Sequence, residues 1–281
     1  MLDVFTDRAL AGNQLAVFTD GEAVPEHQRQ PLARETNFSE TVFLEGPAAG
    51  GDARARIFTP TAEIPFAGHP VLGAAVLVAT TTDRDLVRIE TGSGVVPVRI
   101  ERRPAASPFG RMRQPLPTVT PYSDPAPLLA ALGLSASELP IEVYDNGLAH
   151  VYVACRDVAT VGALEPDMAA LARVARASPY PLMGINCFAG AGRTWTTRMF
   201  CPADGVPEDP ATGSAAGPLA CHLARHGRIA FNEQITISQG ASIGRPSTLY
   251  ALAEGSRDAI TGVEVAGSAV IVARGAFALP N

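Results

Sequence analysis

The sequence predicts a mixed α+β protein built of two pseudo-symmetric lobes, and three observations support this. The chain of 281 residues is too long for a minimal module and suggests one large domain or two of about 140 residues, of which we favour two lobes. Short β-rich runs outnumber helical patterns and do not alternate with them regularly, as βαβ units would. A motif also recurs after half the chain. With 47% hydrophobic and 18% charged residues, the chain has enough apolar residues for a core.

Runs rich in β-branched and aromatic residues mark the expected strands. These lie at 41–44, 55–58, 86–89, 95–100, 141–144, 151–154 and 195–200. Apolar residues at helical spacing mark the expected helices. These lie at 25–36, 70–79, 127–132, 167–177 and 214–225, with Gly227 as the stop signal of the last. Strands therefore dominate, with a minority of helices.

A proline-rich stretch at 114–127 interrupts both periodicities at the place where a connection between lobes is expected. We place the boundary near Pro117, which gives an N-terminal lobe of residues 1–117 and a C-terminal lobe of residues 118–281. The tail at 268–279 also has a strand-like pattern. A last strand at about 268–281 could close the N-terminal lobe, but the sequence alone does not assign it to either lobe.

An internal repeat links the two halves. RIFTP at 56–60 returns 142 residues later as RMFCP at 198–202. Further matches follow in order: Ile-Pro at 64–65 matches Val-Pro at 206–207, and AGH at 67–69 matches TGS at 212–214 after a short insertion. Chance could align a single pentapeptide, but the ordered matches favour duplication. Two lobes of one ancestry are expected.

Each repeat has a glycine directly before an expected helix, Gly68 in the first and Gly213 in the second. A glycine there lets a ligand approach the unpaired N–H groups of the first helical turn, and the helix dipole attracts an anion. Two such helix starts could hold one carboxylate, together with Ser214. Alternatively, both glycines serve only the turn and the close packing of the helices.

Titratable residues cluster on or near these loops. His69 follows Gly68, Glu208 and Asp209 precede Gly213, and Glu40 stands at the entrance of an expected strand. This is the inventory of an acid–base enzyme, which needs a base near a carbon-bound proton and donors for the developing negative charge. Each residue also has a structural alternative: a core histidine, a polar helix end, or solvated loop carboxylates.

Charge and composition exclude several classes of function. A formal charge of −6 offers no basic field for a nucleic-acid backbone, so a small molecule is the expected partner. All 22 basic residues are arginine, which excludes mechanisms that need a lysine amine, including a pyridoxal-phosphate Schiff base. The N-terminus has no leader-like pattern and no 18-residue apolar run occurs, so we expect a cytoplasmic protein away from the membrane.

Cysteine and histidine spacing indicates neither a disulfide scaffold nor a metal centre. The four cysteines, at 155, 187, 201 and 221, form no CxxC pair and are expected to be reduced and buried. His222 and His226 have a metal-compatible spacing but no apparent third ligand. The GAG at 190–192 is too short for a dinucleotide fingerprint. No metal and no cofactor are expected.

Several segments together resemble the PhzF family, whose lobes share the diaminopimelate epimerase fold. They are GNQLAVF at 12–18, NFSET at 37–41, IFTPTAEIPFAGHP at 57–70 and EDPATGSA at 208–215. The resemblance continues through NGLAH at 146–150, NCFAGAG at 186–192 and QGASIGRPS at 239–247. It implies that each lobe is a curled sheet or barrel around a central helix, with the active site between the lobes, and that the protein is a homodimer.

The resemblance also implies an activity: a cofactor-independent isomerase of phenazine biosynthesis that moves a proton from C3 to C1 of trans-2,3-dihydro-3-hydroxyanthranilate. Glu40 would be the acid–base group, and His69 and Asp209 would orient the substrate and relay protons. The expected substrate-binding residues are Ser39, Gly68, Gly213 and Ser214. Two alternatives stay open: an isomerase or epimerase of another small amino or hydroxy acid, and a non-catalytic small-molecule-binding protein.

One departure from the epimerase relatives restricts the chemistry. Those enzymes carry one cysteine in each lobe, before the glycine of each helix-start loop. Here the corresponding residues are Ala67 and Thr212. Racemisation by a pair of thiols is therefore excluded.

Overall fold

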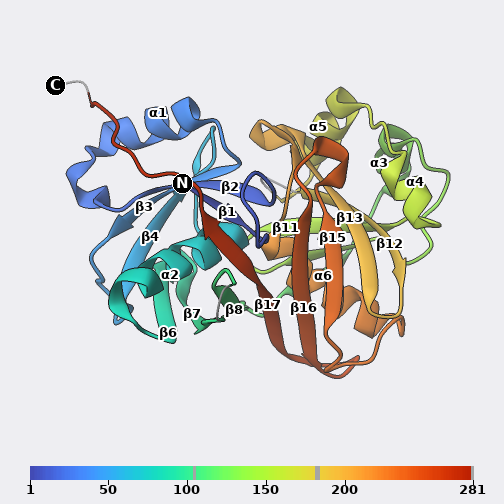
Figure 1. Ribbon diagram of the computed structural model, residues 1–281. Coiled ribbons are helices and arrows are strands. Elements are labelled where there is room, and N and C mark those ends of the chain that lie inside the picture. Colours follow the sequence, from blue (N-terminus) through green and yellow to red (C-terminus); the bar gives the residue numbers. More distant parts are fainter. Residues whose placement is uncertain (104–105, 181–183, 280–281) are drawn as a thin grey trace.

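The computed structural model describes residues 1–103, 106–180 and 184–279. Within these residues, 17 strands form one hydrogen-bonded network with two lobes, which lie side by side in Figure 1. All seven expected strands and all five expected helices are present, with boundaries that differ by at most three residues. The prediction of a strand-rich α+β fold is confirmed.

The N-terminal lobe is a closed barrel. Its strands are β1 (Leu2–Val4), β2 (Asn13–Phe18), β3 (Glu40–Glu45), β4 (Ala53–Phe58), β6 (Leu86–Thr91), β7 (Gly94–Glu101) and β8 (Phe109–Arg113), with the short β5 (Glu63–Ile64) beside β4. The end of β17 (Ile260–Ile271) pairs with β8 and with β1 and so closes the ring. α2 (Gly68–Thr82) lies inside, and its residues 68–76 are all buried. α1 (Glu26–Thr36) packs outside, on β3 and β4.

The C-terminal lobe carries most of the remaining elements. Its strands are β9 (Thr118–Pro121), β10 (Glu142–Asp145), β11 (Ala149–Ala154), β12 (Gly184–Ala191), β13 (Thr194–Cys201), β14 (Val206–Asp209), β15 (Ile235–Gln239), β16 (Ser247–Gly255) and the start of β17. α6 (Gly213–Arg225) packs on β16 and β17. Three further α-helices are α3 (Pro125–Leu132), α4 (Val158–Gly162) and α5 (Met168–Ala177). Short 3-10 helices lie at Gly21–Ala23, Pro202–Asp204 and Ala241–Ile243.

The two lobes repeat one strand plan. In the first lobe, β4 lies antiparallel to β3 and β5 and parallel to β6, and β2 lies parallel to β3. In the second lobe, β13 has the same relations to β12, β14 and β15, and β11 lies parallel to β12. α2 and α6 begin at the equivalent point of each copy. The repeated pentapeptide thus lies on equivalent strands, as duplication predicts.

The tail differs from its prediction. The last strand ends at Ile271, so residues 272–279 are not strand, and residues 280–281 lie outside the described part. The reason is that the ladder between β17 and its partner β1 ends where β1 ends, at Leu2 opposite Ile271. Beyond this point Phe277 packs against Phe18, with ring centroids 5.2 Å apart.

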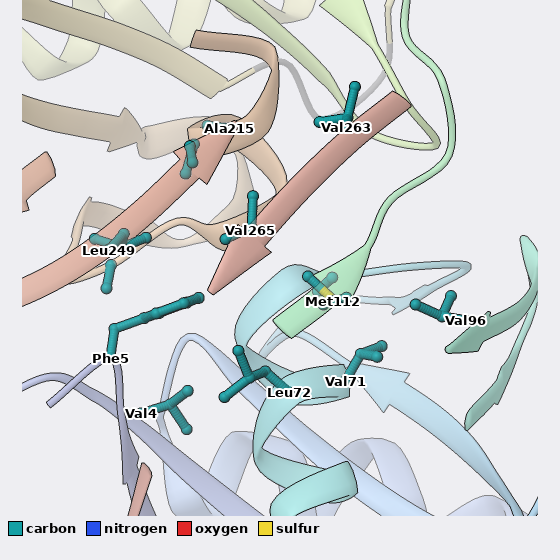
Figure 2. Close-up of a cluster of buried hydrophobic side chains, with 14 of the residues drawn as sticks. Val4, Phe5, Val71, Leu72, Val96, Met112, Ala215, Leu249, Val263 and Val265 are labelled. Carbon is teal, nitrogen blue, oxygen red and sulfur yellow. The ribbon is translucent and has the colours of Figure 1, made fainter. Parts of the chain in front are cut away.

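A shared core joins the lobes. Figure 2 shows Phe5 of the first lobe near Leu249 and Val265 of the second, with Leu72 of α2 close by. Each of these side chains is at most 1% exposed. The hydrophobic core is therefore continuous between the lobes. Among the described residues, the structure contains no helix long and apolar enough to cross a membrane.

Candidate active site

The first turns of α2 and α6 meet between the lobes. A Cβ atom on Gly68 would come within 2.5 Å of the carbonyl carbon of Gly213 and of the nitrogen of Ser214. The residues that precede the two helices, Ala67 and Thr212, make no side-chain capping hydrogen bond. Both helix dipoles therefore direct positive ends into one region, where first-turn N–H groups can donate hydrogen bonds to an anion. The glycines are required for this close approach, whatever ligand binds.

Gly68→Ala tests that requirement. The added methyl group meets backbone atoms, which cannot move aside as a side chain can, so we expect a loss of about 1–3 kcal/mol in the free energy of unfolding. Urea denaturation measures it. Gly162→Ala in α4 is the control, because its methyl group would have no neighbour within 4 Å. A Gly68→Ala variant as stable as wild type would show that the contact between the helix starts is loose.

Next to the helix starts lies a cavity that both lobes line. It encloses about 470 Å³, part of it open to solvent. Its lining residues are Ser39, Glu40, Thr59, Ile64, Leu148, His150, Cys201, Val206, Asp209, Thr212 and Ser214. Four of the predicted site residues, Ser39, Glu40, Asp209 and Ser214, are thus brought together. His69, Gly68 and Gly213 are not among the residues that line it.

Local structure explains the position of Glu40. α1 ends at Asn37, whose backbone is in the left-handed conformation that asparagine tolerates, and the chain then enters β3 at Glu40. The carboxylate Oε2 of Glu40 lies 3.5 Å from Nε2 of His69. Burial lowers the pKa of His69 well below its usual value, although the negative charge of Asp209 opposes the shift. His69 is therefore a neutral imidazole near pH 7.

Asp209 is held by hydrogen bonds from both lobes. Its Oδ1 accepts from Ser39 Oγ at 2.6 Å and from Asn13 Nδ2 at 2.9 Å. Its Oδ2 accepts from Thr212 Oγ1. With 6% of its surface exposed, Asp209 is a fixed carboxylate at the cavity wall. The hydrogen bond between Ser39 and Asp209 thus connects the loop before β3 to the end of β14.

Asn13 also contacts His69. The Nδ2 amide of Asn13 has two protons, and acceptors lie at 2.9 Å on Asp209 and on the Ala211 carbonyl. No proton remains for its 3.1 Å contact with His69 Nδ1. His69 also has a hydrogen bond to the backbone of Gln14. Its other ring nitrogen, Nε2, faces Glu40.

Glu208, a candidate acid–base group in the sequence, has a structural partner instead. Arg198 donates to both of its oxygens, from Nε at 3.0 Å and from an Nη at 2.7 Å. The Glu208 side chain is 6% exposed, and it does not line the cavity. Of the two neighbouring carboxylates, only Asp209 reaches the site.

A second polar cluster lies at the other end of α6. The sequence analysis found no third ligand for His222 and His226, but Glu142 on β10 lies beside both, with Oε2 3.1 Å from His222 Nδ1 and 3.0 Å from His226 Nε2. Arg225 contacts the same oxygen at 2.9 Å, so a positive charge already occupies the position next to it. The arrangement fits an anchor between α6 and β10 better than a metal centre.

This anchor predicts acid sensitivity. Burial would raise the pKa of Glu142, but hydrogen bonds from His222, His226 and Tyr144 lower it to about 2. Because the folded value lies below the unfolded one, Glu142 stabilises the fold above about pH 4.5, and this stabilisation is lost as the pH falls towards 2. Urea midpoints between pH 6 and pH 3 should therefore fall more steeply for wild type than for Glu142→Gln. The exposed Glu165→Gln should follow wild type, and identical slopes for all three proteins would contradict the prediction.

Several site residues had no role in the sequence analysis. Asn13 contacts Asp209 and His69, and Gln239 donates to the Asp209 carbonyl at 2.8 Å and to Thr212 Oγ1 at 3.0 Å. His150 lines the cavity. All three lie in segments that carried the family resemblance, so the signal was present. The sequence did not show which residues these side chains contact.

Two lobes of one plan, with a cavity at their junction that contains two carboxylates and a helix start from each lobe beside it, define an epimerase-like two-lobed α+β protein. The model of the PhzC-PhzF family, described as phenazine biosynthesis-like protein, matches residues 2–275. The chain belongs to this family, as the sequence segments predicted.

Relatives and solved structures agree with this assignment. The chain is 50% identical to a trans-2,3-dihydro-3-hydroxyanthranilate isomerase of Pseudomonas aeruginosa, over 98% of this chain and 97% of the relative. It is 48% identical to the protein of that name from Pseudomonas fluorescens, over 99% and 98% of the two chains. The solved structure of a predicted epimerase from Pseudomonas aeruginosa matches with a TM-score of 0.83 at 30% identity, and the match covers 99% of this chain and 98% of that one. The epimerase-like fold is confirmed.

Proposed function

We propose that this chain converts trans-2,3-dihydro-3-hydroxyanthranilate to its aminoketone by moving a proton from C3 to C1, as a cofactor-independent isomerase of phenazine biosynthesis. The observation that carries the proposal is the cavity at the lobe junction, where Glu40 and Asp209 stand beside two uncapped helix starts. The Pseudomonas relatives of that name, about half identical along the whole chain, support the choice of substrate.

The chemistry of the substrate determines which catalytic and binding groups such a site must supply. The ring keeps double bonds at C4–C5 and C6–C1, so removal of the C3 proton leaves a negative charge that spreads through the diene onto C1 and its carboxylate. A base is needed at C3, and hydrogen-bond donors are needed at the carboxylate. Glu40 is the proposed base. The first turns after Gly68 and Gly213, with Ser214, are the proposed donors.

The remaining side chains complete the proton path. Once Glu40 has taken the C3 proton, the imidazole of His69 can help to relay it, because Nε2 of His69 lies 3.5 Å from Oε2 of Glu40. Glu40 then delivers the proton to C1. Asp209, held by Ser39 and Asn13, accepts hydrogen bonds from the amino and hydroxyl groups of the substrate and orients the ring.

Incubation of the purified protein with trans-2,3-dihydro-3-hydroxyanthranilate in D₂O tests the proposal. We expect the diene absorbance to decay. We also expect deuterium at C1 of the product, to the extent that the proton held by Glu40 exchanges with D₂O before it is delivered. The reaction should need no added cofactor and should persist after dialysis against a chelator. Unchanged substrate at high enzyme concentration would refute the proposed function, and a panel of other small amino and hydroxy acids would then identify the reaction.

We also propose that the protein is a cytoplasmic homodimer with lobes that divide near Pro117, a residue between β8 and β9, and that it binds neither nucleic acid nor membrane. The family resemblance supports the dimer, and the charge of −6 argues against a nucleic-acid partner. Light scattering coupled to gel filtration tests the dimer directly. A monomer at micromolar concentration would contradict it.

A further inference from the structure

The segment at 146–150, which includes the turn after β10 and the first two residues of β11, carries family resemblance but has no role in the mechanism above. Two of its side chains reach Ser214 on α6. His150 Nε2 lies 2.9 Å from Ser214 Oγ, and Asn146 Nδ2 donates to the Ser214 carbonyl at 2.9 Å. His150 is 3% exposed and Ser214 is 2% exposed, and both line the cavity. One short segment thus holds both the backbone and the hydroxyl of Ser214.

The environment of His150 determines which ring nitrogen carries the proton. Burial lowers the pKa of His150 to about 4, so the ring is neutral near pH 7 and has one N–H. Nδ1 is buried and makes no hydrogen bond with any described residue. It faces Gly184 on β12, where a Cβ atom would come within 2.6 Å of it. A buried N–H without an acceptor costs about 1–3 kcal/mol, so the proton belongs on Nε2, where Ser214 Oγ accepts it.

We propose that His150 is a positioning residue that makes the Ser214 hydroxyl a hydrogen-bond donor to the substrate carboxylate. The Ser214 oxygen accepts from His150, and its single proton is therefore directed into the cavity. Without this partner the hydroxyl could rotate and direct a lone pair at the carboxylate, which repels it. This inference rests on the proposed function, in which Ser214 helps to hold the carboxylate.

The same geometry argues against a serine nucleophile at this site. A histidine that activates serine must accept the serine proton on Nε2, and a third group must hold its Nδ1–H. Here Gly184, which has no side chain, stands at Nδ1. In this pair His150 donates to Ser214, and the Ser214 hydroxyl donates a hydrogen bond to the ligand without losing its proton.

His150→Phe and His150→Gln test the proposal together. Phenylalanine keeps a ring without a donor, whereas the side-chain amide of glutamine can place an N–H near the position of Nε2. The probe is 3-hydroxyanthranilate, the aromatic counterpart of the substrate, which has no C3 proton to lose. Calorimetry should show about tenfold weaker binding to His150→Phe and recovery to within about threefold of wild type in His150→Gln. Thermal unfolding shows whether each variant is folded.

A double-mutant cycle with Ser214→Ala separates positioning from a general structural role. If His150 acts through Ser214, adding His150→Phe to Ser214→Ala should weaken binding no further. Multiplicative effects would overturn the proposal, as would wild-type affinity in a folded His150→Phe protein. Binding does not require turnover, so this cycle can succeed even if the isomerase assay fails. In that case the proposed substrate would be wrong, but the assignment of Ser214 and His150 to a carboxylate-binding site would stand.

Discussion

Glu40→Gln is expected to lower kcat by about two orders of magnitude or more while the protein stays folded and still binds 3-hydroxyanthranilate. The amide has nearly the shape of the carboxylate but cannot take a proton from C3. Glu40 lies at the cavity surface with 15% of its side chain exposed, so the substitution disturbs little packing. Loss of diene absorbance gives kcat, and calorimetry gives the affinity for the aromatic ligand.

Glu35→Gln is the matched control for this result. Glu35 is exposed on the last turn of α1, five residues before Glu40 in the sequence, and its substitution should leave kcat unchanged. A folded Glu40→Gln enzyme that kept more than a tenth of wild-type activity would remove Glu40 from the role of base. Asp209 would then be the next carboxylate to test, because it is the other acid that lines the cavity.

Much of the fold could be predicted because its signals are local. Apolar periodicity located the expected elements, and the repeated pentapeptide indicated that the lobes share one plan. β12 was missed because its sequence, GINCFAGA, is rich in small residues and its first six residues are all buried, so it shows no alternation of apolar and polar side chains. The sequence offered closure of the N-terminal lobe by the last strand as one possibility but could not assign that strand to a lobe, because the pairing with β1 joins residues almost 270 positions apart.

The candidate site shows the same division between local and distant information. Glu40, His69 and Asp209 stand in motifs that resemble the PhzF family, so they could be named from sequence. Their partners could not. The bond from Asn13 to Asp209 spans 196 positions, and the contact of His150 with Ser214 spans 64. Such pairs are set by how the lobes pack, and no local pattern encodes that.

Arg198→Ala is expected to be the most destabilising of the substitutions considered, with a loss of about 3–5 kcal/mol in the free energy of unfolding. Arg198 is 12% exposed and Glu208 is 6% exposed in this pair. Removal of the arginine leaves the Glu208 carboxylate buried without a cation. It also removes the donor to the Leu164 carbonyl at 2.6 Å, which ties β13 to the end of α4. Urea unfolding at pH 7 measures the loss.

The internal repeat supplies the control for this prediction. Arg56 is the equivalent of Arg198 in the first lobe and also pairs with carboxylates, but its partners Glu26 and Glu63 are 66% and 42% exposed. Water can solvate those carboxylates when the arginine is removed, so Arg56→Ala should cost only about 1 kcal/mol or less. Equal losses at the two positions would mean that burial does not determine how much each ion pair contributes to the free energy of unfolding. A large loss at Arg198 alone would show that duplicated residues came to differ in energetic role through their surroundings, although the strand that carries them stayed the same.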